Sequence, residues 1–526
     1  MKNLKKYMKY GLAVLLVTGC DTKELHDLNI NPQALNQVNL NFIFTSVELG
    51  IASNGSTGDN RYIDWRTNIG MCAYAIQQLA NSGGGIAPGD KYTVNAETNA
   101  APFEFTYNDQ LKNIAEILKQ SGPGGFAEGK YTNMRNAARI IRAFSFARLT
   151  DFYGNVPYFE ANKGIEGIFF PKYDSQDAIY ADLLKELDEA SAALSTSNPD
   201  DGFAAADFIY KGDIAKWKKW GYSLMLRLAM RISNADAAKA ATYVTKAAAG
   251  GVFTSNADNV WVAMADGPSE WVNQNGISRA FDPGDGGQPT YLSATLVNYL
   301  KGTNQAVATD DDPRLMIISG GIGSDTVITD PVKQKGMPNG YDQAMLDKLE
   351  GKTVDVSKTY SRINTKMLQD SDPYMIMNYG EVELLLAEAI ERKIGSGIAG
   401  TAKSHYDAGV KASMQMYTPY DASLTVSDAA VAAYLTTYPY GTAKPALEMI
   451  GEQMWVNKFF NWWEAWNDWR RTGFPKLTPT NYPGNVTNGT IPVRLRYPTN
   501  EVAGNPNYQT GATLPDEFTT KVWWDK

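Results

Sequence analysis

The sequence predicts a mainly α protein that folds as one large domain. In six segments apolar residues recur every three or four positions, which is the period of one helix face. The apolar–polar alternation that marks a strand is scarce. The connections are long and rich in Gly, Pro, Asn and Asp, and none divides the chain cleanly. The predicted helices span residues 135–152, 177–194, 213–234, 378–393, 402–416 and 447–471.

The first three predicted helices each carry an apolar stripe that can face a core. The segment 177–194 is amphipathic and rich in acids, and the stripe of 213–234 has Gly221 between its members. The stripe residues of the first and third helices are Ile141, Phe144, Leu149, Ile214, Trp217, Leu224, Leu228 and Ile232.

The last predicted helix is the richest in aromatic residues. The stretch 455–475 holds five of the twelve tryptophans. It could serve as a carbohydrate-stacking platform, but the rings at 455, 459, 462, 466 and 469 follow helical spacing, which favours a packed core stripe. Gly473 and Pro475 are the expected stop signals. In the helix 378–393, Val382, Leu385, Leu386 and Ala389 are expected to face inward.

Four long connections are candidate functional surfaces, because long loops in a compact helical protein usually carry function. They span residues 81–90, 256–290, 320–340 and 479–507. The neighbouring helices suggest a scaffold of helix pairs, although no clear period near 34 residues is present.

The N-terminus has the layout of a secretory signal. Four lysines precede an apolar run over 11–17, which is too short to cross a bilayer, and Thr18-Gly19-Cys20 follows. This order resembles the bacterial lipobox and predicts a signal peptide over 1–19, with the lipid (acyl chains such as palmitate) on Cys20. The alternative is an ordinary signal peptide with a chance cysteine. Residues 20–30 would then form a tether, and 20–526 the mature chain.

Net charge and composition limit the kinds of molecule that this protein is expected to bind. Removing the four signal lysines changes the formal charge from -8 to about -12, so an acidic surface disfavours nucleic acid. Aromatic residues make up 11%, with 29 Tyr and 12 Trp. Flat rings suit a sugar- or peptide-binding surface, although any one ring more often fills a core.

The chain lacks the usual signatures of catalysis. His26 and His405 are its two histidines, and neither has a triad or metal partner set in the sequence. Cys72 lies in an apolar stretch and is expected to be a small buried hydrophobe. The Gly395, Gly397 and Gly400 spacing follows a helix, where a dinucleotide fingerprint follows a strand, so it predicts a helix–helix loop. We expect no enzyme activity, no cofactor and no metal site.

Carboxylates leave one catalytic alternative open. Glu381, Glu383 and Glu388 lie on one predicted helix, where a solvated or salt-bridged face is more usual than an acid–base pair. Acids are plentiful elsewhere, so a glycoside hydrolase that uses two carboxylates stays an alternative. The oxygen-rich run 282–287 lacks the spacing of a calcium loop and predicts a turn.

Six motifs, in this order behind the lipobox, resemble the SusD/RagB family of Bacteroidetes outer-membrane lipoproteins, in particular its SusD-like branch. Each motif alone is modest, but together they span most of the mature chain. The motifs are DLNINP at 27–32, ARIIRAFSFARLTDFYGNVPY at 138–158, WKKWGYSLMLRLAMRI at 217–232, DPRL at 312–315, YGEVELLLAEA at 379–389 and EAWNDWRRTGFP at 464–475.

The resemblance implies a mainly α fold built on tetratricopeptide-like helix pairs, with long ligand-facing loops. It implies a lipoprotein on the outer membrane that faces the cell exterior. Such a protein caps a SusC-like TonB-dependent barrel, delivers oligosaccharides or oligopeptides to it, and catalyses nothing. The motifs lie on scaffold helices, so the resemblance assigns no ligand residues.

Candidate ligand residues therefore come from the loops. Exposed rings beside amide side chains suit sugar hydroxyls or a peptide backbone, although each of these residues could instead be structural. The candidates are Trp65, Asn68, Trp261, Trp271, Asn273 and Asn275, with Tyr92 and Tyr291 as weaker ones. A third reading of the chain is an adhesive or structural helical-repeat protein without a small ligand.

Overall fold

The computed structural model describes residues 38–52, 61–83, 88–268, 273–282, 290–324 and 326–526. Residues 41–526 form one compact unit. The predicted signal peptide, Cys20, the tether, His26 and Trp271 lie outside the described residues, as does most of the run 282–287. In the part of the chain that is described, no helix is both long and apolar enough to cross a bilayer.

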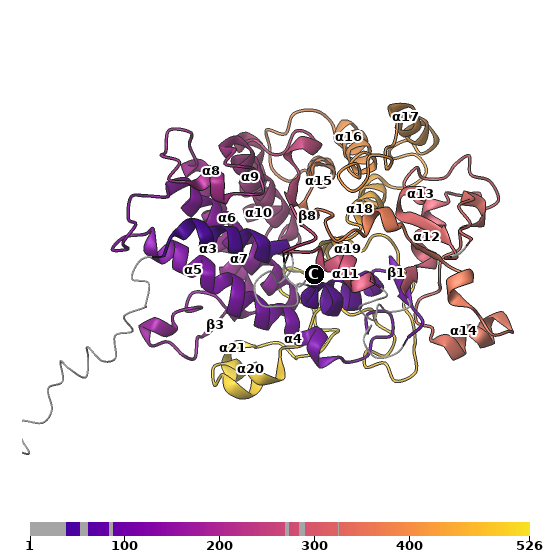
Figure 1. Cartoon of the computed structure of the whole chain (residues 1–526), viewed down its shortest axis with the longest axis horizontal. Helices are drawn as coiled ribbons and strands as arrows, with labels where there is room; N and C mark the ends of the chain where they lie inside the picture. The colour runs from indigo at the N-terminus through magenta and orange to yellow at the C-terminus, as the bar shows by residue number, and fades with distance from the viewer. Residues whose placement is uncertain (1–37, 53–60, 84–87, 269–272, 283–289, 325) are drawn as a thin grey trace, which may run out of the picture. The chain divides into compact units, whose positions relative to one another are not determined.

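Four helix pairs, stacked side by side, form the framework (Figure 1). Within the pairs, α6 packs on α7, α9 on α10, α15 on α16 and α18 on α19. Between the pairs, α7 packs on α9, α9 on α15 and α15 on α18. The pairs are α6 (Thr132–Tyr153) with α7 (Gln176–Ala193), α9 (Ile214–Arg231) with α10 (Ala237–Gly250), α15 (Tyr379–Glu391) with α16 (Ala402–Met414), and α18 (Ala446–Asn457) with α19 (Trp462–Thr472).

The remaining helices surround this framework. Two of them are π-helices, η1 (Asp64–Ala73) and η2 (Thr106–Leu111), and η1 packs against α4, α11 and α19. Short 3-10 helices lie in the connections, and the remaining α-helices are α3 (Leu40–Ala52), α4 (Ala96–Phe105), α5 (Lys112–Gln120), α8 (Phe203–Ala206), α11 (Gly276–Phe281), α12 (Ala294–Leu300), α13 (Leu315–Ile318), α14 (Gln343–Glu350), α17 (Asp428–Thr437), α20 (Thr499–Gly504) and α21 (Tyr508–Gly511).

The described strands are short and form four separate antiparallel pairs, so the mainly α prediction is confirmed. Some of these strands lie in the long connections, so those connections are not entirely irregular. The pairs are β1 (Leu79–Asn81) with β5 (Thr290–Leu292), β2 (Val156–Pro157) with β3 (Tyr173–Asp174), β4 (Val260–Val262) with β8 (Tyr374–Met377), and β6 (Ser319–Ile322) with β7 (Ser361–Ile363).

Side-chain caps and small residues explain the geometry of the α15–α16 pair. Asn378 caps α15 by accepting a hydrogen bond from the Glu381 amide at 2.9 Å. A Cβ on Gly409 of α16 would lie 2.8 Å from Leu384 Cγ and 3.1 Å from the Gly380 carbonyl oxygen. The two helices therefore approach so closely that only glycine fits at this contact. The loop that joins them holds Gly395, Gly397 and Gly400, all with positive φ, as a helix–helix loop predicts.

The predicted helix 447–471 is wrong in one respect, because it is broken into α18 and α19. Phe460 has a φ of +78°, which an L residue rarely adopts, and the helix cannot continue through it. Tertiary hydrogen bonds replace the lost helical ones: the Phe460 carbonyl accepts from Asn68 Nδ2 at 2.9 Å, and Asn461 Nδ2 donates to the Ile376 carbonyl at 3.1 Å. The core interpretation is confirmed, since Trp455, Phe459, Trp462 and Trp466 are buried and Trp469 is partly buried.

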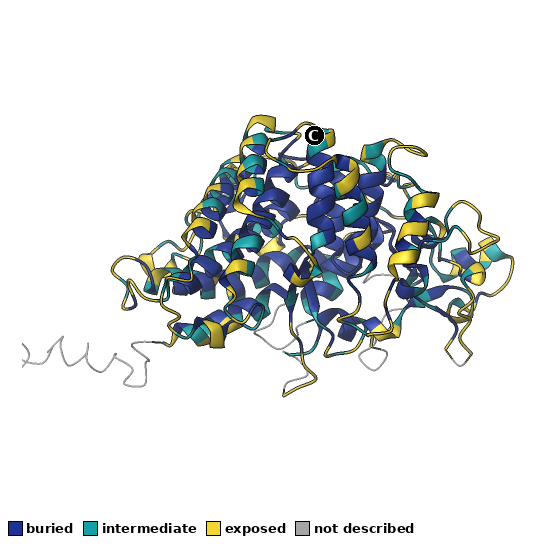
Figure 2. Cartoon of the chain, turned by 90° about the horizontal axis from the view of Figure 1, so that it is seen from above, coloured by how far each residue is buried: buried dark blue, intermediate teal, exposed yellow. Residues whose placement is uncertain are grey.

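The faces along which the helix pairs pack are mostly buried (Figure 2). These buried faces contain ion pairs as well as apolar side chains. Arg231 on α9 donates to Asp151 on α6 and to Glu464 on α19, at 2.6 Å each. Arg227 on α9 binds Glu381 on α15 through two hydrogen bonds of 2.6 and 2.7 Å. The helix pairs are therefore joined by charges that are almost completely buried.

Further ion pairs extend this network. Lys458 lies 3.0 Å from Glu381 and also pairs with Asp468. Arg471 binds Glu388, with one hydrogen bond of 2.7 Å. Glu381 and Glu388 on α15 are thus salt-bridged, one of the two arrangements expected for these carboxylates. Apart from Lys458, these charged residues come from four of the six sequence motifs, so those motifs supply most of the ion pairs between the scaffold helices.

Candidate ligand-binding surface

Trp65 lies on η1 and is partly exposed. Two guanidinium groups flank its indole, with Cζ of Arg66 4.2 Å and Cζ of Arg61 5.1 Å from the ring centroid. Arg66 also pairs with Glu97 on α4. The surface around Trp65 therefore combines an aromatic ring, hydrogen-bond donors and a carboxylate.

Buried polar residues anchor η1, the helix that carries Trp65. Asn68 is fully buried; it donates to Asp64 Oδ1 and to the Phe460 carbonyl, both at 2.9 Å, and accepts from the Trp463 amide. Tyr374 donates to Asp64 Oδ1 at 2.7 Å. Burial raises the pKa of Asp64 to about 7, although these hydrogen bonds oppose the rise. The structure thus gives Asn68 a scaffold role, because it ties η1 to the α18–α19 break.

Trp261 lies on β4 and is partly exposed. Its ring meets Tyr420 edge-on, with the centroids 5.6 Å apart, and Tyr420 in turn contacts Phe460. Phe460 is also the residue whose carbonyl accepts from Asn68. The supports of Trp261 and Trp65 are therefore connected through the α18–α19 break.

Asn273 and Asn275 differ in how accessible their side chains are to a ligand. Asn273 is partly exposed, and its backbone carbonyl accepts from the Ala265 amide at 2.9 Å. Asn275 is 4% exposed and caps α11, accepting from the Ile277 amide at 2.9 Å and donating to the Asp372 carbonyl at 3.0 Å. Its amide is therefore engaged by the scaffold.

The two weaker tyrosine candidates also differ. Tyr92 is 1% exposed, and its hydroxyl accepts from the Thr480 amide at 3.0 Å, which leaves no ring face for a ligand. Tyr291 on β5 is partly exposed and lines a cavity of about 240 Å³ together with Phe281 and Arg362. Trp65, Trp261, Asn273 and Tyr291 therefore keep accessible side chains, and their role as ligand contacts stays a prediction.

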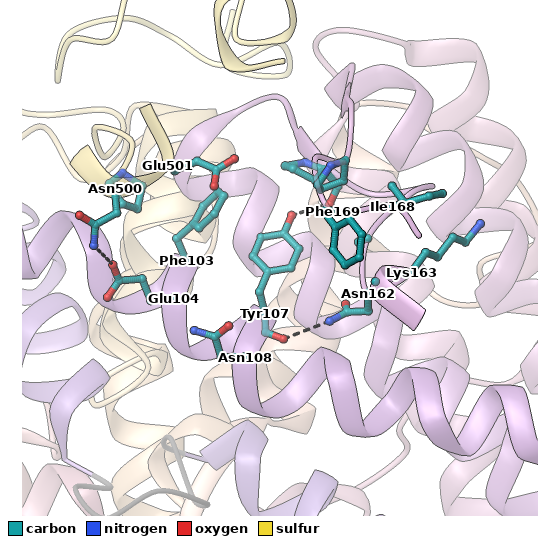
Figure 3. A pocket seen from close by; sticks show the side chains of 15 residues that line it. Phe103, Glu104, Tyr107, Asn108, Asn162, Lys163, Ile168, Phe169, Asn500 and Glu501 are labelled. Atoms are coloured by element: carbon teal, nitrogen blue, oxygen red, sulfur yellow. Dashed lines mark hydrogen bonds between the residues drawn. The ribbon is translucent and has the colours of Figure 1, made fainter. Parts of the chain in front are cut away.

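A larger pocket, of about 500 Å³, was not predicted from the sequence (Figure 3). We call it the Tyr107 pocket. Three segments far apart in the chain build it: the α4–η2 junction, the β2–β3 loop and the start of α20. Its lining is Phe103, Glu104, Tyr107, Asn108, Pro157, Ala161, Asn162, Lys163, Gly164, Ile168, Phe169, Pro171, Pro498, Asn500 and Glu501.

The groups considered for catalysis have structural partners. His405 Nδ1 lies 2.6 Å from Glu383 Oε2, and its Nε2 lies 2.7 Å from the Ala399 carbonyl. Cys72 is fully buried, and burial raises the pKa of its thiol, so it is the inert hydrophobe expected. Among the described residues, no cluster of three or more His, Cys, Asp or Glu side chains could hold a metal ion.

Comparison with known proteins decides the family. The family model SusD-like_2, described as starch-binding associating with outer membrane, matches residues 32–498. The chain belongs to the SusD-like family. Members of this family are binding proteins, and this SusD-like protein is accordingly a nutrient-binding protein associated with the outer membrane.

Solved structures agree with this assignment. A chitin-binding protein is 31% identical, with a TM-score of 0.76, over 92% of this chain and 99% of that one. The fold is shared with a Bacteroidetes AC2a SusD-like protein at 24% identity, with a TM-score of 0.77, over 93% of this chain and all of that one. A SusD homolog from Bacteroides uniformis, at 23% identity and a TM-score of 0.73, has the same coverage. No curated protein matches the sequence. The expected fold of tetratricopeptide-like helix pairs is therefore confirmed.

Proposed function

We propose that this SusD-like protein is a lipid-anchored receptor that captures oligosaccharides on the cell surface. It delivers them to a SusC-like TonB-dependent barrel, which it covers as an extracellular lid. The observation that carries the choice of ligand is the 31% identity, over nearly the whole chain, to a protein named for binding chitin. Oligopeptides are the alternative ligand class.

The Trp65 surface supports a sugar ligand. A pyranose has apolar faces that stack on an indole and hydroxyls at its edge that need donors and acceptors. Arg61, Arg66 and Glu97 supply such groups around the Trp65 ring. Trp261 offers a second partly exposed indole, whose orientation is fixed by Tyr420. Rings held before the ligand arrives lose little conformational freedom on binding.

A binding panel tests the ligand class. The intact chain is titrated calorimetrically with tri-N-acetylchitotriose, maltotriose and a tripeptide mixture, and each mixture is analysed for cleavage products. We expect sugar binding without cleavage, and about ten-fold weaker binding in Trp65→Ala or Trp261→Ala. Trp469→Ala, another partly buried tryptophan, is the matched control and keeps wild-type affinity. Binding of the tripeptides alone, or release of shorter sugars, contradicts the proposal.

The anchor and the barrel are tested on native material. Gently purified, C-terminally tagged protein from outer membranes is examined by native mass spectrometry, where we expect a large barrel protein in the same complex. Protein that arrives alone and empty argues for the adhesive or structural reading. Cys20→Ser protein, produced without the barrel, is expected to leave the membrane fraction, since acyl chains are its proposed attachment.

A further inference from the structure

The Tyr107 pocket is aromatic and rigidly built. The Tyr107 hydroxyl donates to the Pro157 carbonyl, and its ring contacts Phe103 at 4.8 Å and Phe146 at 6.2 Å between centroids. This ring therefore has a fixed orientation. Phe169, from the β2–β3 loop, lies across the pocket from Tyr107 and is 75% exposed (Figure 3). Ile165 (86% exposed) and Phe159 (46% exposed) lie close to Phe169 in the sequence, so this loop exposes several apolar side chains together, as binding surfaces do.

The rim of the pocket carries polar groups with spare hydrogen-bonding capacity. Glu501 accepts from the Tyr173 hydroxyl and from Asn505 Nδ2, at 2.8 Å each, both through Oε1. Glu104 Oε1 accepts from Asn500 Nδ2 at 3.3 Å. The second oxygen of each carboxylate has no protein donor within the described residues. The exposed Asn108 amide likewise has no such partner there.

The chemistry of the lining selects a class of ligand. The volume of about 500 Å³ lies in the range of about 300–1,000 Å³ that is usual for small-molecule sites. An anionic ligand would face two carboxylates, Glu104 and Glu501, against the single cation Lys163 of the lining. An apolar ligand would leave these carboxylates desolvated without partners. A neutral sugar matches both halves of the site, because its ring face covers Phe169 while its hydroxyls donate to the free oxygens.

We infer that the Tyr107 pocket is a second carbohydrate-binding site, which holds one or two neutral sugar units of an oligosaccharide. The inference rests on the proposed function, since it takes the ligand class from it, and it adds a site that no predicted residue touches. The two sites lie on neighbouring sides of α4. Phe105 packs against Tyr62 beside Trp65, at 5.2 Å between centroids, while Phe103 and Glu104 line the pocket.

This proximity suggests how the sites cooperate. A long oligosaccharide that is held at Trp65 presents its further units to the Tyr107 pocket at a high effective concentration. Two weak sites on one rigid support then retain long chains better than short ones. Size selection of this kind suits a protein that captures polymer fragments.

The test counts sites with tri-N-acetylchitotriose and maltotriose as probes. Calorimetric titration of the intact wild-type chain is expected to give two sites per molecule for at least one probe. Phe169→Ala and Asn108→Ala change side chains on the surface, so folding is not at risk, and each is expected to weaken one of the two sites about ten-fold. Phe170→Ala is the matched control, because Phe170 is 57% exposed on the same loop but does not line the pocket.

The outcomes separate the two proposals. Loss of the remaining site in Trp65→Ala, with the Phe169-sensitive site intact, supports both. A single site that responds to Trp65→Ala and ignores Phe169→Ala and Asn108→Ala overturns the second site and leaves the proposed function standing. No sugar binding by the wild-type chain overturns both. Cleavage of a probe that is abolished by Glu104→Gln or Glu501→Gln shows that the pocket is an active site and overturns the inference.

Discussion

Replacing Arg231 by methionine tests the ion network that joins the helix pairs. Arg231 is 1% exposed and bridges Asp151 on α6 to Glu464 on α19, at 2.6 Å on each side. Methionine fills similar space without charge, so the variant removes the cation and opens little cavity. Asp151 keeps the Tyr180 hydroxyl and the Trp524 indole as donors. Glu464 loses its close hydrogen-bonded cation and keeps Arg227 at 3.9 Å and the charge of Lys458.

The expected cost is about 3–5 kcal/mol, which is typical when one partner of a buried ion pair is removed and the other stays charged. For a chain of about 500 residues the entropy of unfolding makes this a fall in Tm of roughly 3–5 °C. The double variant Arg231→Met with Glu464→Gln is expected to recover part of the loss. Its buried carboxamide costs less to keep without a cation than a carboxylate does.

The pH dependence gives a second signature. Burial acts to raise the pKa of Glu464, but the charges of Arg231, Arg227 and Lys458 outweigh it and hold this pKa well below its ordinary value. A depressed pKa contributes stability that is present above the unfolded pKa of about 4.5 and is lost as pH falls toward the folded pKa. The gap between wild type and Arg231→Met is therefore wide at pH 7 and narrower at pH 4.

Urea denaturation followed by tryptophan fluorescence, at pH 7 and pH 4, measures this gap. Arg139→Met is the matched control. Arg139 lies near the surface and pairs with the half-exposed Glu189 at 2.8 Å and with Glu186 at 3.5 Å, and Glu186 keeps Arg142 as a partner, so this change is expected to cost at most about 1 kcal/mol. If Arg231→Met is as stable as this control at pH 7, the network does not hold the helix pairs together, and the reasoning fails.

Two further predictions concern stability. Burial raises the pKa of Asp64 from 3.8 to about 7, so the unfolded chain releases this proton at a lower pH than the folded chain does. The free energy of unfolding is therefore expected to fall by up to about 4 kcal/mol as pH rises from 4 to 7. Asp64→Asn is expected to remove this loss, so it exceeds wild-type stability at pH 8 but not at pH 4; equal denaturation midpoints at pH 8 would argue against it. Gly409→Ala forces a methyl group against Leu384 and is expected to cost about 1–3 kcal/mol in thermal unfolding. Gly504→Ala, where a Cβ meets nothing within 4 Å, is its control, and equal melting of the two variants would show that α15 and α16 can separate.

The sequence predicted the helices well because their stripes face a continuous core. The segment 213–234 became α9 with Asp213 as its N-cap, and 378–393 became α15 with Asn378 as its cap. The break between α18 and α19 escaped prediction because the apolar spacing continues through it. Phe460 adopts a positive φ, and its carbonyl accepts a hydrogen bond from Asn68, almost 400 positions earlier. The spacing of apolar residues around a position does not indicate a hydrogen-bond partner that is so distant in the sequence.

The candidate site was harder to predict for a related reason. Asn68 and Trp65 are three positions apart in one polar, aromatic stretch, yet Asn68 is fully buried and Trp65 is partly exposed. The π-helical geometry of η1 separates them, and nothing in the stretch marks a π-helix. The Tyr107 pocket was missed because Tyr107, Phe169 and Glu501 become neighbours only when three distant segments meet.

The distribution of roles explains why the family was easier to identify than the ligand. Arg227, Arg231, Glu381 and Glu464 lie in the motifs that resemble the family, and all four belong to the buried network. A buried charged residue tolerates few replacements, because removing one member of an ion pair leaves the other buried without a counter-charge. Trp65 and Phe169 face solvent and can change without that penalty. The residues that identify the family are therefore the ones that stabilise the scaffold. The residues that select the ligand must be sought among the surface aromatic rings outside the motifs.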